Sequence, residues 1–347
     1  MFSIYKFYFR SNPSKGLKLM SKNMHLSAKI FVAGHSGLVG SAIVRALKKQ
    51  GYTNLILRTK QELDLSEQTN VRNFFAQEKP EFVFMAAAKV GGIVANNNYP
   101  VDFGYQNQMI QSNVIHASWE NKVKRLLFLG SSCLYPRDCP QPMREEHLLT
   151  GPLESTNKAY ALAKISGISL CESFNQQYDT KYIVGMPTNL YGPNDNYDLQ
   201  ASHVIPALMR KIHEAKIYKA SFVEVWGSGV AKREFMHSND MGDAALFLLN
   251  LPDSQYNGLI DCPTTGPLVN IGYGKDISIK ELVELLCHIV GFNGEIRWDR
   301  TKPDGTPQKL LHTEKINKMG WQPKLSLAEE LRRIYIDKFC NETNLIF

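Results

Sequence analysis

Long apolar runs, paired cysteines and closely spaced histidines are all missing from this sequence. No stretch approaches the roughly 20 apolar residues that a membrane-spanning helix needs. The six cysteines contain no Cys-x-x-Cys pair, and the nine histidines contain no His-x-His or His-x-x-x-His pattern. These absences argue against a disulfide framework and against a metal site. We therefore expect reduced thiols in a cytoplasmic protein that binds no metal and does not enter a membrane.

Acidic residues are absent from positions 1–27, which contain five cations: Lys6, Arg10, Lys15, Lys18 and Lys22. They contribute much of the net charge of +7, so this charge does not by itself indicate a nucleic-acid partner. We expect residues 1–27 to be a disordered basic extension, with a targeting peptide as the alternative.

The 347 residues are 44% hydrophobic and 21% charged, as in a folded protein with one large or two modest domains.

A strand, a glycine turn and a helix follow one another where the expected fold begins. Residues 28–33 are an apolar run, the turn contains Gly34, Gly37 and Gly40, and residues 42–49 have a helical pattern. In this order the glycines permit a tight turn and bring backbone N–H groups close to a pyrophosphate at the helix N-terminus. A loop without a ligand is the alternative. We predict a dinucleotide site.

The end of the second expected strand, residues 54–57, lacks the carboxylate that usually holds the ribose hydroxyls of NAD. Arg58 and Lys60 stand there instead, and no acid occurs before Glu62. Two cations suit the 2′-phosphate of NADP, whereas the simpler alternative is a solvated strand end. We therefore expect NADP(H) rather than NAD(H).

Short apolar strands alternate with helical stretches through the first half of the chain. The later strands are expected at residues 82–85, 125–129 and 182–186. This alternation is typical of parallel strands joined by crossover helices. We expect an α/β fold in which residues 28–195 form a Rossmann-type, doubly wound parallel sheet.

Proline, glycine and aromatic residues become more frequent after residue 195, which indicates a smaller C-terminal α/β substrate-binding domain. We assign residues 196–235 and 263–347 to this domain and expect residues 236–262 to return to the first. Residues 222–226 are predicted to be an isolated strand. The helices expected in this half cover residues 204–215, 240–251, 279–290 and 327–339.

Tyr160 and Lys164 are four residues apart in a helical pattern, so their side chains share one helix face. A neighbouring ammonium favours the phenolate, and we expect it to draw the pKa of the phenol down from about 10 toward neutrality. The segment 130–136 adds the Ser131 hydroxyl and the Cys133 thiol. Taken alone, the Tyr-Lys pair is equally consistent with an exposed surface pair, so its context decides.

Longer motifs resemble the extended short-chain dehydrogenases that act on nucleotide sugars, and within them the GDP-L-fucose synthases. The similar segments span most of residues 28–325 and are 34–40, 86–96, 130–136, 160–164, 187–193, 202–206, 225–229 and 302–307. The resemblance implies that GDP-4-keto-6-deoxy-D-mannose is converted into GDP-L-fucose, by inversion of two carbons and reduction of the ketone with NADPH. It also implies a homodimer that packs two helices of each subunit, for which residues 107–119 and 160–174 offer apolar faces.

The same resemblance implies roles for individual residues. Ser131, Tyr160 and Lys164 match the reductive group, and Cys133 and His203 match the acid/base pair that inverts the carbons. The positions that match substrate contacts are Lys211, Trp226, Arg233 and Asp304. The implied cofactor contacts are Gly34, Ser36, Gly37, Leu38, Val39, Gly40, Arg58, Lys60, Asp64, Leu65, Leu129, Gly130, Lys164, Pro187, Asn189, Leu190 and His203. Some relatives carry Arg where Ser36 stands, which leaves the 2′-phosphate to Arg58 and Lys60.

The implied chemistry requires these residue types. Both carbons flank the ketone, so loss of a proton from either leaves an enolate, and a serine hydroxyl and a phenol can hydrogen-bond its oxygen. Inversion needs a base on one face of the sugar and an acid on the other. A thiol with an ordinary pKa of about 8.5 and an imidazole with one of about 6.5 need only modest shifts to form thiolate and imidazolium.

Each residue also has a simpler alternative. Cys133 would be inert packing and His203 a helix cap. Lys211 and Arg233 would be surface charges, Trp226 a core residue and Asp304 a turn former. For the whole protein, the alternatives are another nucleotide-sugar epimerase or reductase of the same family, a non-catalytic NADP-binding scaffold and, from charge alone, a nucleic-acid binder.

Overall fold

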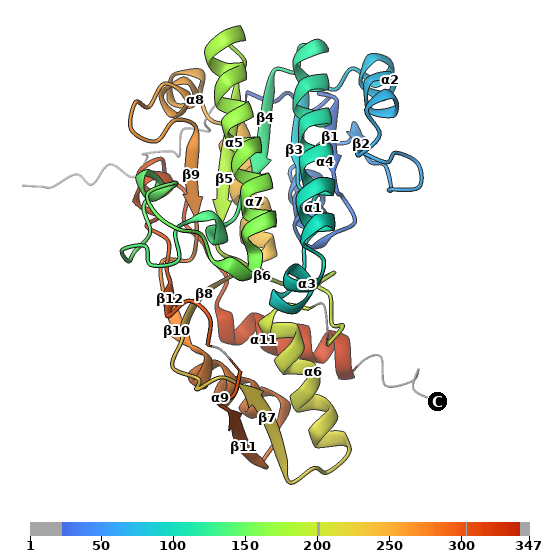
Figure 1. Ribbon diagram of the computed structural model, residues 1–347. Coiled ribbons are helices and arrows are strands. Elements are labelled where there is room, and N and C mark those ends of the chain that lie inside the picture. The colour runs from blue at the N-terminus through green and yellow to red at the C-terminus, as the bar shows by residue number, and fades with distance from the viewer. Residues whose placement is uncertain (1–22, 200–201, 303, 341–347) are drawn as a thin grey trace, which may run out of the picture.

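The computed structural model describes residues 23–199, 202–302 and 304–340. Figure 1 shows a larger unit built on a layered sheet and, below it, a smaller unit of helices and short strands. Residues 1–22 of the expected basic extension lie outside the described residues.

Six parallel strands form the large sheet, in the order β2-β1-β3-β4-β5-β9. Their bounds are Leu55–Ile56 for β2, Ile30–Ala33 for β1, Phe82–Met85 for β3, Arg125–Leu129 for β4, Tyr182–Pro187 for β5 and Leu268–Ile271 for β9. The central strands are buried along their whole length. Because helices cover both faces, these strands are continuous apolar runs rather than alternating ones. The predicted α/β fold with a doubly wound parallel sheet is confirmed.

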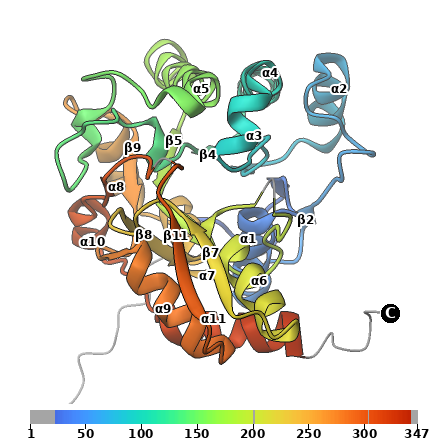
Figure 2. The ribbon, with the colours of Figure 1, turned by 60° about the horizontal axis from the view of Figure 1, so that its bottom comes forward.

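Two helical layers enclose this sheet, as Figure 2 shows. One layer consists of α2 (Gln68–Glu78), α4 (Pro100–Glu120) and α5 (Lys158–Tyr178), and the other of α1 (Leu38–Lys49), α7 (Ser238–Leu249) and α8 (Asp253–Ile260). Neighbouring side chains of β4 pack against opposite helical layers. Phe128 packs on the side of α4 and α5, whereas Leu127 packs on the side of α1 and α7. This alternation follows from the two-residue period of a strand.

The smaller unit has its own core between α6 (Val204–Ile217), α9 (Ile279–Val290) and α11 (Leu327–Tyr335). The strand β7 (Phe222–Trp226) was expected to be isolated, and this expectation is wrong. It pairs in parallel with β11 (Glu295–Asp299), a partner about 70 residues later that the sequence pattern did not reveal. After α11 the chain continues as a π-helical turn over Ile336–Cys340.

The strand β8 (Lys232–His237) joins the two units. It pairs with β10 (Asp276–Ser278) and β12 (Gln308–Lys309) of the smaller unit. It also pairs with β6 (Asn189–Tyr191), which follows β5 of the large sheet almost directly. The pairing of β8 with β6 therefore fixes β8, and the strands β10 and β12 paired with it, relative to the large sheet.

The chain returns to the large unit over a longer segment than expected. Residues 263–347 were assigned to the second domain, yet β9 within them lies at the edge of the large sheet. Ile316 and Trp321 are also buried in the core beside α1 and α7. The edge of β5 would otherwise leave a row of backbone groups without partners, and β9 supplies those partners.

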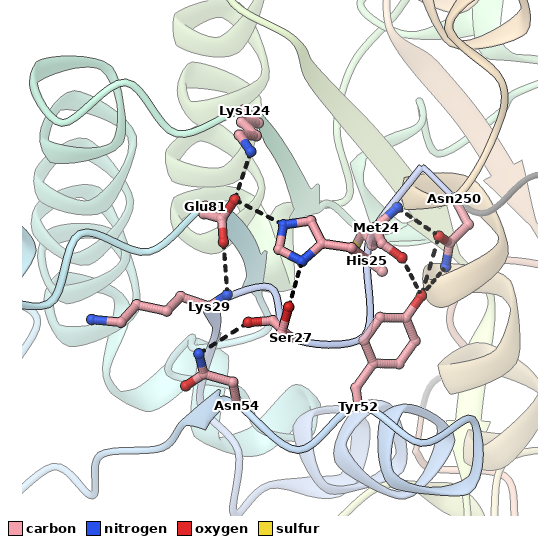
Figure 3. A network of polar contacts seen from close by, with 9 residues as sticks. All are labelled: Met24, His25, Ser27, Lys29, Tyr52, Asn54, Glu81, Lys124 and Asn250. Atoms are coloured by element: carbon pink, nitrogen blue, oxygen red, sulfur yellow. Dashed lines mark hydrogen bonds and ion pairs between the residues drawn. The ribbon is translucent and has the colours of Figure 1, made fainter.

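Residues 23–27 pack against the large unit, although the sequence placed them in the disordered extension. The Met24 side chain is fully buried. Its N–H donates to Asn250 Oδ1 at 3.1 Å, and its carbonyl accepts from the Tyr52 hydroxyl at 3.1 Å (Figure 3). Next to it, His25 lies 3.2 Å from the Glu81 carboxylate. The ordered fold therefore begins before the first strand.

Candidate active site

The carboxyl ends of β1, β4 and β5 carry most of the predicted site residues. Gly34 follows β1, Gly130 and Ser131 follow β4, and Pro187 ends β5. In a parallel sheet these ends lie along one edge, where the ligands of such folds bind. Of the other predicted cofactor residues, Leu129 ends β4, Asn189 and Leu190 belong to β6, and Asp64 and Leu65 follow β2.

Ser131 and Cys133 form the centre of this edge. The backbone of Ser131 is extended and caps a short 3-10 turn over Ser132–Leu134, and its Oγ accepts from the Cys133 N–H at 3.3 Å. The Cys133 Sγ lies 3.0 Å from the same Oγ. Because buried Leu134 anchors the turn in the core, the hydroxyl and the thiol are held side by side.

Tyr160 and Lys164 lie on α5, which packs against this turn. Burial lowers the pKa of Lys164 to about 8, and its Nζ lies 4.3 Å from the centroid of the Phe128 ring. The pKa of Tyr160 is raised, first by burial and then by the negative charge of an ionised Cys133. The expectation that Lys164 draws this pKa down is therefore wrong, because burial opposes the phenolate. The neutral phenol is favoured, with its proton available for donation.

Two of the three glycines in the loop, Gly34 and Gly40, leave no room for a side chain. Gly34 has φ +80°, and a Cβ there would lie 2.7 Å from the Ala87 nitrogen. A Cβ on Gly40 would lie 2.0 Å from the Gly34 oxygen. Gly37 caps α1, so the N–H groups of Leu38 and later residues in the first turn point out of the helix end without an intrahelical partner. This cradle fits the pyrophosphate of a dinucleotide.

The two predicted 2′-phosphate cations differ in their surroundings. Arg58 is paired with Glu78 of α2, with 2.6 Å between Nη2 and Oε1. The Lys60 side chain is 73% exposed, and its Nζ lies 3.8 Å from Asp64 Oδ2. That carboxylate accepts from the N–H and the hydroxyl of Ser66. Lys60 is therefore the more available cation of the two.

His203 and Lys211 come from the smaller unit, on α6. His203 caps this helix in an extended conformation. Part of the residue is exposed to solvent. Burial of the imidazole by the surrounding protein nevertheless lowers its pKa, because the charged form loses hydration. Free His203 is thus more often neutral than expected, and its protonated form is a stronger acid. Farther along α6, the Lys211 Nζ lies 5.3 Å from the ring centroid of Trp226, which is half exposed.

Arg233 of β8 and Asp304 of the loop before β12 lie in contact. The Arg233 Nη2 donates to the Asp304 carbonyl at 3.2 Å. The Asp304 carboxylate accepts from the N–H and the hydroxyl of Ser228, at 2.6 and 2.7 Å, and these bonds lower its pKa. Asp304 thus fastens its own loop to the one that follows Trp226. Its carboxylate is occupied by the protein itself, in agreement with the turn-forming alternative.

Sequence reasoning missed two lysines near these residues. The Nζ of Lys302 lies 5.6 Å from the Trp226 ring centroid. Lys309 of β12 is the register partner of Arg233 and interacts electrostatically with Cys133. Both lie in or directly after the similar segment 302–307, so the signal available in the sequence was their place in that motif.

The part of the chain that the structure describes lacks two further features. It contains no group of three or more His, Cys, Asp or Glu residues arranged to hold a metal ion. None of its helices is both long and apolar enough to cross a membrane.

Comparison with known proteins places this geometry in a family. Residues 30–271 match the family model described as the NAD dependent epimerase/dehydratase family. The chain is 55% identical over 318 residues to GDP-L-fucose synthase 1 of Arabidopsis thaliana, covering 91% of this chain and 95% of that protein. It is 50% identical over 310 residues to GDP-L-fucose synthase of Escherichia coli K12, covering 88% and 95%.

One solved structure that is similar to this chain in sequence and in fold is that of MlghC, a GDP-mannoheptose C4 reductase from Campylobacter jejuni with NADP bound. It is 39% identical, with a TM-score of 0.80, and the match covers 90% of this chain and 98% of that one. The chain therefore belongs to the NAD dependent epimerase/dehydratase family.

Proposed function

We propose that the chain converts GDP-4-keto-6-deoxy-D-mannose into GDP-L-fucose, by epimerising two carbons and reducing the ketone with NADPH. The observation that carries this proposal is the 3.0 Å contact between Ser131 and Cys133 beside α5. A thiol that could remove a proton, beside a hydroxyl that could bind a ketone oxygen, supports this combination of activities. The high identity to two GDP-L-fucose synthases over most of the chain supports the same substrate.

Epimerisation comes first, while the ketone is present to stabilise the enolate. The ionised Cys133 removes a proton from a carbon beside the ketone, and the electron pair moves to the ketone oxygen. Ser131 and Tyr160 donate hydrogen bonds to that oxygen. His203 returns a proton to the opposite face of the ring, and its lowered pKa makes the protonated imidazole a ready donor.

Reduction uses the same oxygen-binding groups. The chemistry supplied by bound NADPH is hydride transfer to the ketone carbon. Tyr160 gives its proton to the ketone oxygen, which the raised pKa of the phenol permits because the side chain carries its proton at neutral pH. Lys164, with its pKa lowered to about 8, remains mostly protonated at pH 7 and favours the phenolate that is left.

The protein residues also suit the nonreacting parts of the ligands. The first turn of α1 receives the dinucleotide pyrophosphate, and Lys60 receives the 2′-phosphate. Arg233 and Lys211 pair with the diphosphate of the sugar nucleotide, and the exposed face of Trp226 lies beside them.

A direct assay tests the proposal. Purified protein is incubated with GDP-4-keto-6-deoxy-D-mannose and NADPH in heavy water, and the product is identified by NMR. We expect GDP-L-fucose with deuterium at both carbons beside the original ketone. A reduced sugar without deuterium would instead support a C4 reductase such as the GDP-mannoheptose enzyme. Cofactor binding without turnover of either GDP-sugar would support a non-catalytic scaffold.

A homodimer forms part of the proposal. Exposed apolar side chains gather on α4, on α5 and on α3 (Ile93–Asn98), where Val101 is 76% exposed, Tyr105 64% and Leu162 48%. Exposed apolar side chains on neighbouring helices suit contact with a second copy of the chain. Light scattering of Tyr105→Glu tests it, since a dimer on this face should dissociate.

A cytoplasmic location stays a prediction from the sequence.

A further inference from the structure

The turn that follows β7 is held in place from two sides. The Gly227 N–H donates to the carbonyl of Asp299 in β11 at 2.9 Å, and the Gly229 carbonyl accepts from a backbone N–H in the first turn of α9, also at 2.9 Å. Gly227 has φ +84°, which favours glycine, and a Cβ there would collide with Asp304 Oδ1. Ser228, between the two glycines, is therefore fixed in position close to Asp304.

Ser228 holds the Asp304 carboxylate with both of its donor groups. Its N–H donates to Oδ1 at 2.6 Å, and its hydroxyl donates to Oδ2 at 2.7 Å. Because one bond goes to each oxygen, the direction of the carboxylate is fixed as well as its place. The same bonds lower the pKa of Asp304, so the acceptor stays ionised at neutral pH. The loop before β12 is thereby fastened to the turn after β7.

The backbone of Asp304 in turn orients Arg233. The Arg233 Nη2 donates to the Asp304 carbonyl at 3.2 Å, and Nη1 donates to the Lys232 carbonyl at 2.7 Å. These bonds use two of the five N–H groups of a guanidinium, which leaves the others for a ligand. Burial lowers the pKa of Arg233, and the charge of Asp304 partly offsets this. A partly enclosed cation of this kind gains from an anionic ligand.

We propose that Ser228 acts through Asp304 as a positioning residue for Arg233, and thereby for the diphosphate of the sugar nucleotide. This inference rests on the proposed function, in which Arg233 pairs with that diphosphate. The Asp304 carboxylate then contacts the protein rather than the substrate, and the Asp304 carbonyl sets the direction of the guanidinium. An arginine that is ordered beforehand loses less side-chain entropy on binding, which for one long side chain corresponds to roughly a three- to tenfold gain in affinity.

The affinity for GDP measures this effect without turnover. Wild type, Ser228→Ala and Asp304→Ala are titrated with GDP in a calorimeter. Ser221→Ala is the matched control, because it removes an exposed serine hydroxyl directly before β7. Circular dichroism checks the fold, and Asp304→Asn replaces the alanine variant if that variant does not fold.

We expect Ser228→Ala to weaken GDP binding by about three- to tenfold, whereas Ser221→Ala should match wild type. With the GDP-sugar as substrate, KM should rise by a similar factor and kcat should change less, because the reacting groups lie on the turn after β4 and on α5. An unchanged affinity for GDP in Ser228→Ala overturns the proposal. So does an equal loss in Ser221→Ala, or a fall in kcat without a rise in KM.

Double variants show whether the effect passes through Asp304 and Arg233. Residues that act through one another have effects that do not add. Ser228→Ala should therefore add little to the loss in Asp304→Ala and little to the loss in Arg233→Met. Additive losses in either pair overturn the proposed route. A loss in Asp304→Ala without one in Ser228→Ala would do the same, and would show that the Asp304 carboxylate contacts the ligand directly.

Failure of the proposed function gives a different result. Wild type that binds GDP but leaves GDP-4-keto-6-deoxy-D-mannose unchanged would contradict the proposed reaction alone, and the GDP affinities would still decide the role of Ser228. Wild type that binds no GDP would contradict both proposals.

Discussion

The thiol of Cys133 lies 3.0 Å from the hydroxyl of Ser131. One short turn after β4 holds both residues. In the proposed reaction the Ser131 hydroxyl has one proton to donate, and it donates to the ketone oxygen during epimerisation and during reduction. The Cys133 thiolate beside it acts as the base in the first of these steps. The same turn therefore supplies the base and a hydrogen-bond donor to the oxygen.

Cys133→Ser should separate the two activities. Serine keeps the shape of the turn, but its hydroxyl is too weak an acid to form the base at neutral pH, so proton removal should fail. The reductive residues stay in place, so the ketone should still be reduced slowly. In heavy water the variant should yield a GDP-6-deoxyhexose with no deuterium beside the carbinol carbon and with neither centre inverted. Formation of GDP-L-fucose at the normal rate would make Cys133 a packing residue.

Tyr160→Phe should nearly abolish reduction of the ketone. The phenol supplies the proton that accompanies hydride arrival, and general acid catalysis of this kind contributes about a hundred- to ten-thousand-fold. Loss of NADPH absorbance measures the rate, and substrate binding measured by calorimetry serves as the control. A variant that binds substrate and turns over at the wild-type rate would refute the role of Tyr160.

Lys60→Ala should reduce the preference for NADPH over NADH. Lys60 is mostly exposed, whereas Arg58 is occupied by Glu78, so the 2′-phosphate should depend chiefly on Lys60. Loss of one charge-assisted hydrogen bond costs about 1.5–3 kcal/mol. Titration with both cofactors checks this, because NADH has no 2′-phosphate and its affinity should change little. Equal losses for the two cofactors would contradict the assignment.

Lys164→Met should stabilise the fold at pH 7 and lose this advantage at high pH. The folded-state pKa of about 8 lies below the ordinary 10.5, so the unfolded state binds more protons between these values. The cost of the charge is fully present below pH 8, and wild-type stability rises from there to about pH 10.5. The cost is on the order of 3 kcal/mol, since one pKa unit corresponds to about 1.4 kcal/mol. Urea unfolding of both proteins at pH 7 and pH 10 measures it, and a difference independent of pH would contradict the pKa.

Asn250→Ala should destabilise the protein through Met24. The buried Met24 N–H would lose its acceptor, which costs about 1–3 kcal/mol. Asn54→Ala is the matched control in the same network (Figure 3), because its bond to the Ser27 carbonyl is exposed. Chemical denaturation should show a clear loss for the first variant and a small one for the second. Equal losses would mean that the contact of Met24 contributes little.

The sequence by itself determined five of the six strands of the large sheet and the residue types of the site. The strands β3, β4 and β7 and the helix α9 occupy the predicted residues, because a buried strand or an amphipathic helix is recognisable from its own apolar pattern. The glycine loop and the four-residue spacing of Tyr160 and Lys164 are also local features. Roles for Cys133 and His203 came from family resemblance, since an isolated thiol or imidazole carries no local signal.

Only the tertiary structure decided which groups meet. Arg58 is neutralised by Glu78, β7 finds β11, and Met24 is buried against α7, all through contacts between residues distant in the sequence. The pKa of Tyr160 moves opposite to the direction that Lys164 alone suggests, because burial depends on every element packed around the phenol. Local patterns determine how much apolar surface each segment must cover, whereas charge, pairing and burial at one atom are properties of the assembled fold.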